Sequence, residues 1–248
     1  MMDQTQRPPL LARITKWLGL AALAIALIGP TLARYDIVSK IAGFSALLGA
    51  GALSLIGILT GMVALTIAWS KRTGGSKETL VGLIPAILVF GFLGIGAASA
   101  GKYPAIHDAT TDLADPPEFT TLQLRKDNLA GVDTVANWRA IHAEAYPDLA
   151  TIIMDEPVPA VVAKAEKLAK DRGWTVAAVE PAAGHLEATA DVSWIRFHDD
   201  VVLRVRPLDG DARSEVDMRS VSRVGVGDLG ENAKRVRAFM ADLKSLQP

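Results

Sequence analysis

The sequence contains no cysteine among its 248 residues. This absence excludes disulfides, thiolate nucleophiles and thiolate metal sites in one step. No ionisable side chain lies within the three long apolar segments of the first hundred residues, Trp17–Ala33, Ile41–Trp69 and Leu80–Ala100. Transporters, pumps and channels usually carry such a side chain at membrane depth, where it is costly and functional. The sequence therefore disfavours a transport role and indicates that these segments serve as an anchor.

The apolar segments themselves are long enough to cross a bilayer. A hydrocarbon core roughly 30 Å thick needs about 20 residues of helix. We therefore predict a membrane domain over residues 1–101, with three transmembrane helices at about residues 12–33, 38–69 and 79–100. Residues 102–248 are expected to form a soluble domain, which is long enough to bury a core without disulfides.

Lysines and arginines near the ends of these segments predict the orientation. With the N-terminus inside, the cytoplasmic side holds Arg7, Arg13, Lys16, Lys71, Arg72 and Lys77. The opposite side holds only Arg34, Lys40 and Lys102. We therefore expect a multi-pass protein of the bacterial inner membrane with a periplasmic C-terminal domain. Residues 31–33 make a poor signal-peptide cleavage site, and cleavage there would still leave that domain outside.

The charge of the soluble part and the small residues of the second apolar segment limit the partners that this protein can have. Residues 102–248 carry eighteen lysines and arginines against twenty-four acidic residues, which disfavours nucleic acid because phosphates need a basic surface. The expected partner is the lipid bilayer, and no cofactor is expected. Gly57 and Gly61 belong to a stripe of small residues that lets helices approach closely. This stripe predicts either packing within the chain or a homo-oligomer formed through the second span.

The order of elements after the membrane domain predicts an α+β fold with a mainly antiparallel sheet covered by helices. Helices are expected over residues 132–145, 159–172 and 229–246. Strands are expected over residues 150–154, 174–180, 185–191, 201–206 and 214–221, and residues 194–197 form a fifth strand of the later run or an extension of its second. Residues 103–119, broken by prolines, are expected to be extended but not a core strand.

The last two strands are expected to form a hairpin. Residues 209–210, Asp-Gly, favour a two-residue turn. In that register Arg204 faces Glu215, Asp200 faces Arg219, and apolar pairs line the opposite face. The pattern favours a half-exposed ladder, in which these charges have a structural role.

Two segments resemble a known family. They are FHDDVVLRVR from Phe197 to Arg206 and EVDMRSVSRVGVGDLGENAKR from Glu215 to Arg235. Together with the His-Asp and Thr-Thr-Asp steps of residues 107–112, they resemble domain of unknown function 1499 in its membrane-anchored bacterial branch. Other branches open with an Asn-Cys-Val-Ser-Ser-like segment, so no function of that cysteine carries over. The resemblance covers about residues 103–246 and names no reaction.

A candidate anion site follows the hairpin. Serines, glycines and arginines precede a helix N-terminus, whose free amides and positive dipole end suit an anion. The candidate contacts are Arg219, Ser220, Ser222, Arg223, Asn232 and Arg235. The alternative is structural: Asp228 caps the helix in a capping box with Glu231, and Arg223 braces the loop.

Metal binding and catalysis find weaker support. The weak metal candidates are His107, Asp108, Asp112, His198, Asp199 and Asp200, without a recognised zinc spacing. Asp199 and Asp200 point to opposite faces of a strand and so cannot act as an acid/base pair on one substrate. The leading hypothesis is a non-catalytic envelope module that binds a protein, an anionic small molecule or a lipid headgroup. The alternatives are a periplasmic hydrolase and a scaffold for a membrane complex.

Overall fold

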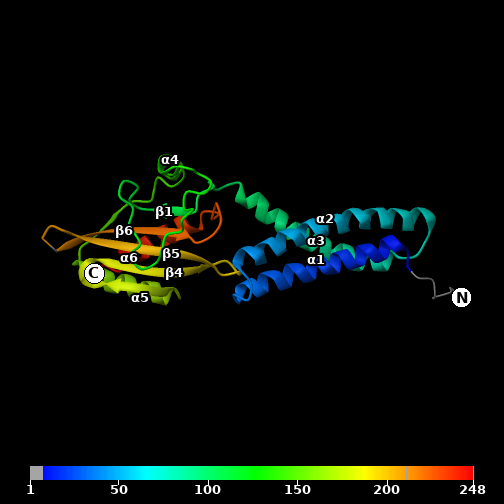
Figure 1. Cartoon of the computed structure of the whole chain (residues 1–248), viewed down its shortest axis with the longest axis horizontal. Coiled ribbons are helices and arrows are strands. Elements are labelled where there is room, and N and C mark those ends of the chain that lie inside the picture. The colour runs from blue at the N-terminus through cyan, green and yellow to red at the C-terminus, as the bar shows by residue number, and fades with distance from the viewer. Residues whose placement is uncertain (1–7, 211, 248) are drawn as a thin grey trace. The chain divides into compact units, whose positions relative to one another are not determined.

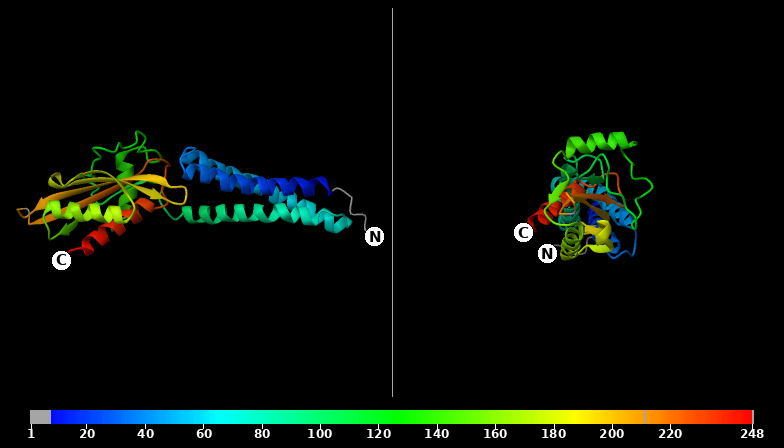
Figure 2. Two further views of the ribbon diagram at one scale, coloured as in Figure 1. Left: turned by 90° about the horizontal axis from the view of Figure 1, so that it is seen from below. Right: turned by 90° about the vertical axis from the view of Figure 1, so that its left-hand side faces the viewer.

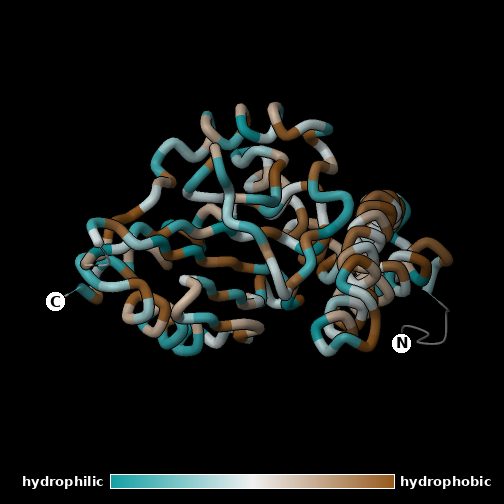
Figure 3. Tube along the Cα trace, turned by 60° about the vertical axis from the view of Figure 1, so that its left-hand side comes forward, coloured by the Kyte–Doolittle hydropathy of each residue, from teal (hydrophilic) through white to brown (hydrophobic). Residues whose placement is uncertain are grey.

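The computed structural model describes residues 8–210 and 212–247 (Figure 1). It divides into two compact units, Met1–Gly101 and Lys102–Pro248. The first unit holds three helices: α1 (Leu10–Arg34), α2 (Lys40–Lys71) and α3 (Ser76–Ala100). All three are long and apolar enough to cross a membrane, which confirms the predicted number, and apolar residues dominate their course in Figure 3.

Glycines let the three helices touch along their backbones. A Cβ atom on Gly82 would lie 2.1 Å from the Thr15 carbonyl oxygen, and one on Gly19 would lie 1.8 Å from the Gly82 carbonyl oxygen. The stripe on α2 also faces its neighbours, since a Cβ on Gly57 would lie 3.5 Å from side chains of both α1 and α3. These glycines therefore serve packing within the chain.

The second unit is an α+β domain, as predicted. Its elements are β1 (Asp108–Thr110), α4 (Val135–Ala145), β2 (Ile152–Met154), α5 (Val158–Asp171), β3 (Thr175–Glu180), η1 (Pro181–Ala183), β4 (His185–Val192), β5 (Phe197–Leu208), β6 (Arg213–Ser222) and α6 (Glu231–Ser245). The strand order is β1-β6-β5-β4-β3, and β2 also pairs with β6. Each of these pairings is antiparallel.

The main core lies between one face of this sheet and the helices α5 and α6 (Figure 2). Alternate residues of the two longest strands, such as Leu203 and Met218, point to this face and are buried. They pack against Val161 of α5 and Phe239 of α6. Trp174 stacks on Phe239 with ring centroids 5.0 Å apart. The opposite face of the sheet carries charged side chains, among them Arg204, Asp217 and Arg219.

The predicted hairpin register is wrong by two residues. Arg204 lies opposite Asp217 rather than Glu215, and Asp200 likewise lies opposite Val221. The connection is longer than two residues because the ladder already ends at Leu208 and Arg213, on either side of residues 209–212. An even shift leaves every side chain on its expected face, so the predicted division between charged and apolar faces is correct.

Two further local expectations are wrong. The stretch of residues 103–119 contains a buried strand, β1, which pairs with β6. Neither alternative for residues 194–197 is correct: residues 193–196 form the turn that joins β4 to β5, and Phe197 is the first residue of β5. Ser193 and Arg196 take left-handed conformations in this turn, with φ of 64° and 61°.

Candidate functional site

The six candidate anion ligands come from three consecutive segments. β6 supplies Arg219, Ser220 and Ser222, the following loop supplies Arg223, and α6 supplies Asn232 and Arg235. Side chains alternate between faces along a strand, so the two serines point towards α6 while Arg219 points to the charged face. The structure therefore divides the predicted site between the two faces of the sheet.

Four of the six candidates meet in one buried network beneath α6. Ser220 Oγ donates a hydrogen bond to Asn232 Oδ1 at 2.7 Å, and Asn232 Nδ2 donates to Ser222 Oγ at 2.8 Å. Arg235 Nη1 donates to Ser220 Oγ and to Asn232 Oδ1 at 2.8 and 2.7 Å. Its Nη2 pairs with Asp199 Oδ2 at 2.8 Å. These polar atoms satisfy one another inside the protein.

Asp199 supplies the negative charge that pairs with Arg235 in this network. Burial raises the pKa of Asp199, while the charge of Arg235 and hydrogen bonds from Ser222 and Arg235 oppose that rise. Arg235 is thus the counter-ion of a buried carboxylate. An external anion would have to displace Asp199 to reach it.

Arg219 has a counter-ion of its own on the charged face. Its Nε and Nη2 atoms donate to the Asp108 carboxylate at 3.0 and 2.7 Å, which is a bidentate pair. Asn128 Nδ2 donates to the same carboxylate at 2.6 Å. The guanidinium also lies over the Trp138 ring at 5.9 Å, and Trp138 Nε1 donates to the Asp108 carbonyl oxygen. Both members of the ion pair are buried or nearly so.

Arg223 is the candidate that solvent reaches most freely, with 44% of its side chain exposed. It donates to both oxygens of Asp200 at 2.8 and 2.7 Å and to Thr189 Oγ1 at 2.9 Å. It borders a shallow recess with a cavity volume of about 10 Å³. The recess is lined by Phe119, Gln123, Leu124, Arg125, Asp200, Val221, Ser222 and Arg223.

The start of α6 is occupied by a carboxylate of the chain. Asp228 accepts hydrogen bonds from the amides of Gly230 and Asn232 at 2.8 and 2.7 Å. Asp228 therefore satisfies amides at the start of α6, but it is not the N-cap residue, because α6 begins at Glu231 and Gly230 is its N-cap. The second half of the capping box is wrong, because Glu231 pairs with Lys234 at 2.7 Å. The free amides that would attract an anion are thus partly satisfied already.

The weak metal candidates are likewise engaged by other groups. Within residues 8–210 and 212–247, no group of three or more metal-ligating side chains forms a potential ion site. Asp108, Asp199 and Asp200 pair with Arg219, Arg235 and Arg223, and Asp112 pairs with Arg204 at 3.1 Å. His198 Nδ1 lies 2.8 Å from Asp191, and His107 Nδ1 lies 3.1 Å from the Val226 carbonyl oxygen.

Sequence reasoning missed Glu187, a fully buried carboxylate of β4. Its oxygens accept hydrogen bonds from the amides of Thr120, Thr121 and Leu122, and His185 lies 2.8 Å away. Burial alone would raise the pKa of Glu187, but these hydrogen bonds outweigh it and lower the pKa to about 2. Glu187 therefore fastens the loop of residues 120–122 to the sheet.

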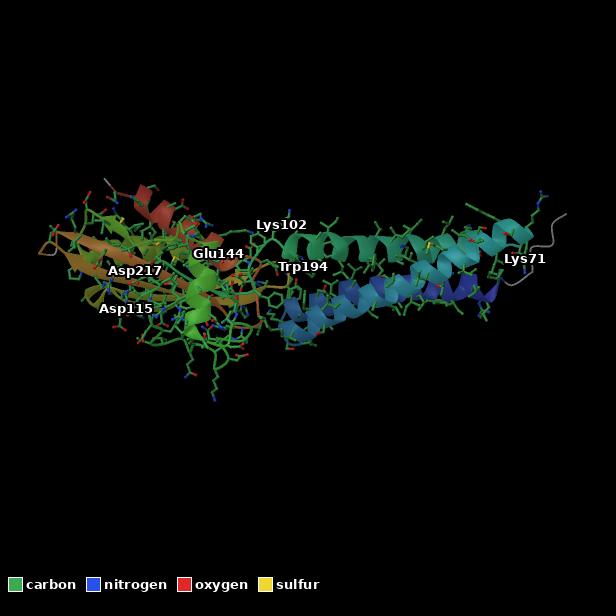
Figure 4. All side chains as sticks on the ribbon, turned by 90° about the horizontal axis from the view of Figure 1, so that it is seen from above. Lys71, Lys102, Asp115, Glu144, Trp194 and Asp217 are labelled. Atoms are coloured by element: carbon green, nitrogen blue, oxygen red, sulfur yellow. The ribbon has the colours of Figure 1, made fainter. Side chains whose placement is uncertain are left out.

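Asp217 of β6 is a second fully buried carboxylate that the sequence analysis left out. It accepts hydrogen bonds from the hydroxyls of Thr111 and Thr151 and pairs with Arg204 and Arg206 at 3.3 and 3.2 Å. Figure 4 labels Asp217 on the sheet. The correct hairpin register would have revealed this residue, because it places Asp217 directly opposite Arg204.

A search of known protein families supports the resemblance noted above. A family model described as a protein of unknown function (DUF1499) matches residues 108–243. No curated protein matches the chain. The matched segment runs from β1 into α6, covers more than half of the chain and contains all six anion candidates. The chain therefore belongs to the DUF1499 family.

Proposed function

We propose that this protein is a membrane-anchored, non-catalytic module of the bacterial envelope. Its domain would lie on the periplasmic side of the inner membrane and bind an anionic group of a protein, a small molecule or a lipid headgroup. One observation carries the binding proposal: Arg223 presents an exposed guanidinium beside a recess. The distribution of lysines and arginines around the three apolar helices supports the orientation.

The recess favours a small group over a large ligand. Its cavity volume of about 10 Å³, room for about one water, is far below the roughly 300–1,000 Å³ typical of pockets for drug-sized molecules, so an anion would bind at its mouth rather than inside it. Arg125 from the loop before α4 lines it together with Arg223, and its Nη1 donates to the Gly225 carbonyl oxygen at 2.7 Å. A planar guanidinium suits phosphate or carboxylate oxygens. Two such groups from distant segments border the same small space.

Asp200 limits the strength of this site. It already neutralises Arg223, so an anion would share the guanidinium with a carboxylate of the chain. We therefore expect weak binding that salt screens readily. Arg219 and Arg235 then have supporting roles, because each is held inside the protein by a buried aspartate.

The hydrolase alternative fits this geometry less well. Asp199 and Asp200 point to opposite faces of β5, and each is paired with a different arginine. The scaffold alternative rests on Gly57, which packs against α1 and α3 of the same chain. The binding proposal is thus the one for which the structure supplies an accessible charged group next to a recess.

The test of binding uses the full chain in detergent with inorganic phosphate as the probe. Arg223→Ala alone would remove the counter-ion of the buried Asp200 and so would destabilise the domain as well as remove the proposed ligand. The informative variant is therefore the double change Arg223→Ala/Asp200→Asn, and the matched control is Arg196→Ala, which removes an exposed arginine paired with Asp191. We expect phosphate to raise the melting temperature of the wild type and the control but not of the double variant. An equal rise in all three would contradict the proposal.

The proposed orientation has a separate test. Alkaline phosphatase fused after Pro248 should be active in intact cells, because that enzyme folds only outside the cytoplasm. Green fluorescent protein fused at the same point should remain dark after export by the general secretory route. The reverse pattern would place the domain in the cytoplasm.

A further inference from the structure

One end of the domain gathers exposed apolar side chains from three separate segments. The strand registers place Asp199 opposite Ser222 and Asp108 opposite Val221. The chain entry before β1, the β4–β5 turn and the β6–α6 loop therefore lie at the same end of the sheet. Figure 4 shows Trp194 of the turn and Lys102 of the chain entry at this end of the domain.

We name this patch the apolar end surface and define it by Tyr103, Trp194, Val226 and Leu229. These side chains are 37%, 57%, 48% and 49% exposed. The other large exposed apolar side chains of the described domain are Leu124, Val135, Ile153 and Leu246, which belong to separate segments. Ile153 lies opposite Glu215, towards the other end of β6. A patch built from three segments and containing a tryptophan and a tyrosine indicates an interaction site.

The backbone that carries these side chains is held in place by packing and hydrogen bonds. Ile195, next to Trp194, is buried, and the following Arg196 donates to Asp191 at 2.7 Å. Tyr103 lies against the start of α6: its ring would be 2.6 Å from a Cβ on Gly230, and Lys234 Nζ lies 5.0 Å from the ring centroid. The exposed side chains therefore project from anchored backbone.

The length of chain between the last apolar helix and this surface identifies what covers it. α3 ends at Ala100, and Tyr103 already packs within the domain, so only residues 101 and 102 intervene. At about 3.6 Å per residue, an extended tether of this length reaches only about 10 Å. The polar interface of a bilayer adds roughly 5–8 Å on each side of the hydrocarbon core. The tether thus holds the chain entry, which belongs to the apolar end surface, at the membrane interface.

We infer that the apolar end surface docks into the interfacial region of the lipid bilayer. Tryptophan and tyrosine are the residues that favour this region, because each has an apolar ring and a polar group that stays hydrated. The net charge of residues 102–248 is negative, so attraction to anionic lipids does not explain the docking. The occupant is therefore lipid, and apolar contact holds the domain against it. This inference goes beyond anion binding and holds for either orientation of the domain.

The absence of native cysteine allows a clean test with single labels. Val226→Cys places a nitroxide on the apolar end surface, and Ile153→Cys places one at the opposite end of the sheet as the matched control. The full chain is reconstituted in vesicles of phosphatidylethanolamine and phosphatidylglycerol. Collisions with oxygen, which concentrates in lipid, are compared with collisions with a water-soluble nickel chelate. We expect a high oxygen-to-nickel ratio at residue 226 and a low ratio at residue 153.

The inference would be overturned by a label at residue 226 as accessible to nickel as that at residue 153, or by lipid contact at both positions. A second variant probes the contacts themselves. In the Val226→Cys background, Trp194→Ser/Leu229→Ser should lower the oxygen-to-nickel ratio several-fold, and an unchanged ratio would refute the role of those side chains. Spin–spin broadening that disappears on dilution with unlabelled chain would identify a second copy as the occupant and also refute lipid docking. Because phosphate binding is measured in detergent, its result is independent of these.

Discussion

Replacing Glu187 with glutamine should make the domain less stable at neutral pH but not in acid. Glu187→Gln keeps the size of the side chain and removes its charge. The carboxylate accepts hydrogen bonds from three consecutive amides, two from threonines and one from Leu122. Hydrogen bonds to a charged acceptor are stronger than those to a neutral one, and the glutamine amide nitrogen would face amide donors.

The pKa of Glu187 sets the size and sign of the effect. Its pKa falls from 4.5 to about 2 in the folded protein. At 1.36 kcal/mol per pKa unit, that difference corresponds to about 3 kcal/mol of folding free energy. A lowered pKa means that this stability is fully present above about pH 5 and is lost as the pH falls towards about 2. The variant should therefore lose about 3 kcal/mol at pH 7 and progressively less as the pH falls.

Urea unfolding of the full chain in detergent measures the difference in unfolding free energy between wild type and Glu187→Gln. The signal is the fluorescence of the domain tryptophans, such as buried Trp138. The matched control is Glu180→Gln, which changes an exposed glutamate on the neighbouring strand. It should alter stability little at any pH. A constant gap between wild type and Glu187→Gln from pH 7 to pH 3 would refute the reasoning, as would no gap at pH 7.

Two glycine pairs supply further predictions. Gly184→Ala should destabilise the domain by about 3 kcal/mol, because φ is 70° and the new Cβ would lie 1.9 Å from a carbonyl oxygen of β5. Gly210→Ala, with a φ of 67° and no neighbour within 4 Å, should cost only about 1 kcal/mol in the same urea experiment. In the membrane unit, Gly82→Ala should weaken α1–α3 packing by about 1–3 kcal/mol, while Gly91→Ala should be neutral. Unfolding by sodium dodecyl sulfate, followed by circular dichroism, compares that second pair, and equal effects within either pair would contradict the packing described.

Features that depend on neighbouring residues could be predicted from the sequence. The three apolar helices follow from length and composition, which no distant partner alters. α5 was expected over residues 159–172 and extends over Val158–Asp171, because a proline in its first turn and Gly173 after its end mark both limits. The division of the β5–β6 hairpin into a charged and an apolar face was also correct, since it depends only on alternation.

Features that depend on distant partners could not be predicted. β1 is a polar segment, and Asp108 is buried there only because Arg219, more than a hundred residues later, neutralises it. The hairpin register could not be predicted for a related reason. A shift of two residues leaves every side chain on the same face of the sheet, so the hydrophobic pattern cannot distinguish the two registers. The candidate arginines had the residue type that an anion site needs, but the sequence does not show which aspartate each one meets.

Internal ion pairing also bears on how the domain meets a membrane. Arg219 and Arg235 form ion pairs with buried aspartates. They therefore add nothing to the basic surface that a count of arginines would suggest. The domain as a whole has six more acidic than basic residues. Anionic lipid should therefore repel most of its surface, and only apolar contact at Trp194 and its neighbours can offset that repulsion. It follows that replacing phosphatidylglycerol with phosphatidylcholine should deepen the label at residue 226 or leave it unchanged. A shallower label would mean that basic side chains, rather than apolar ones, hold the domain to the bilayer.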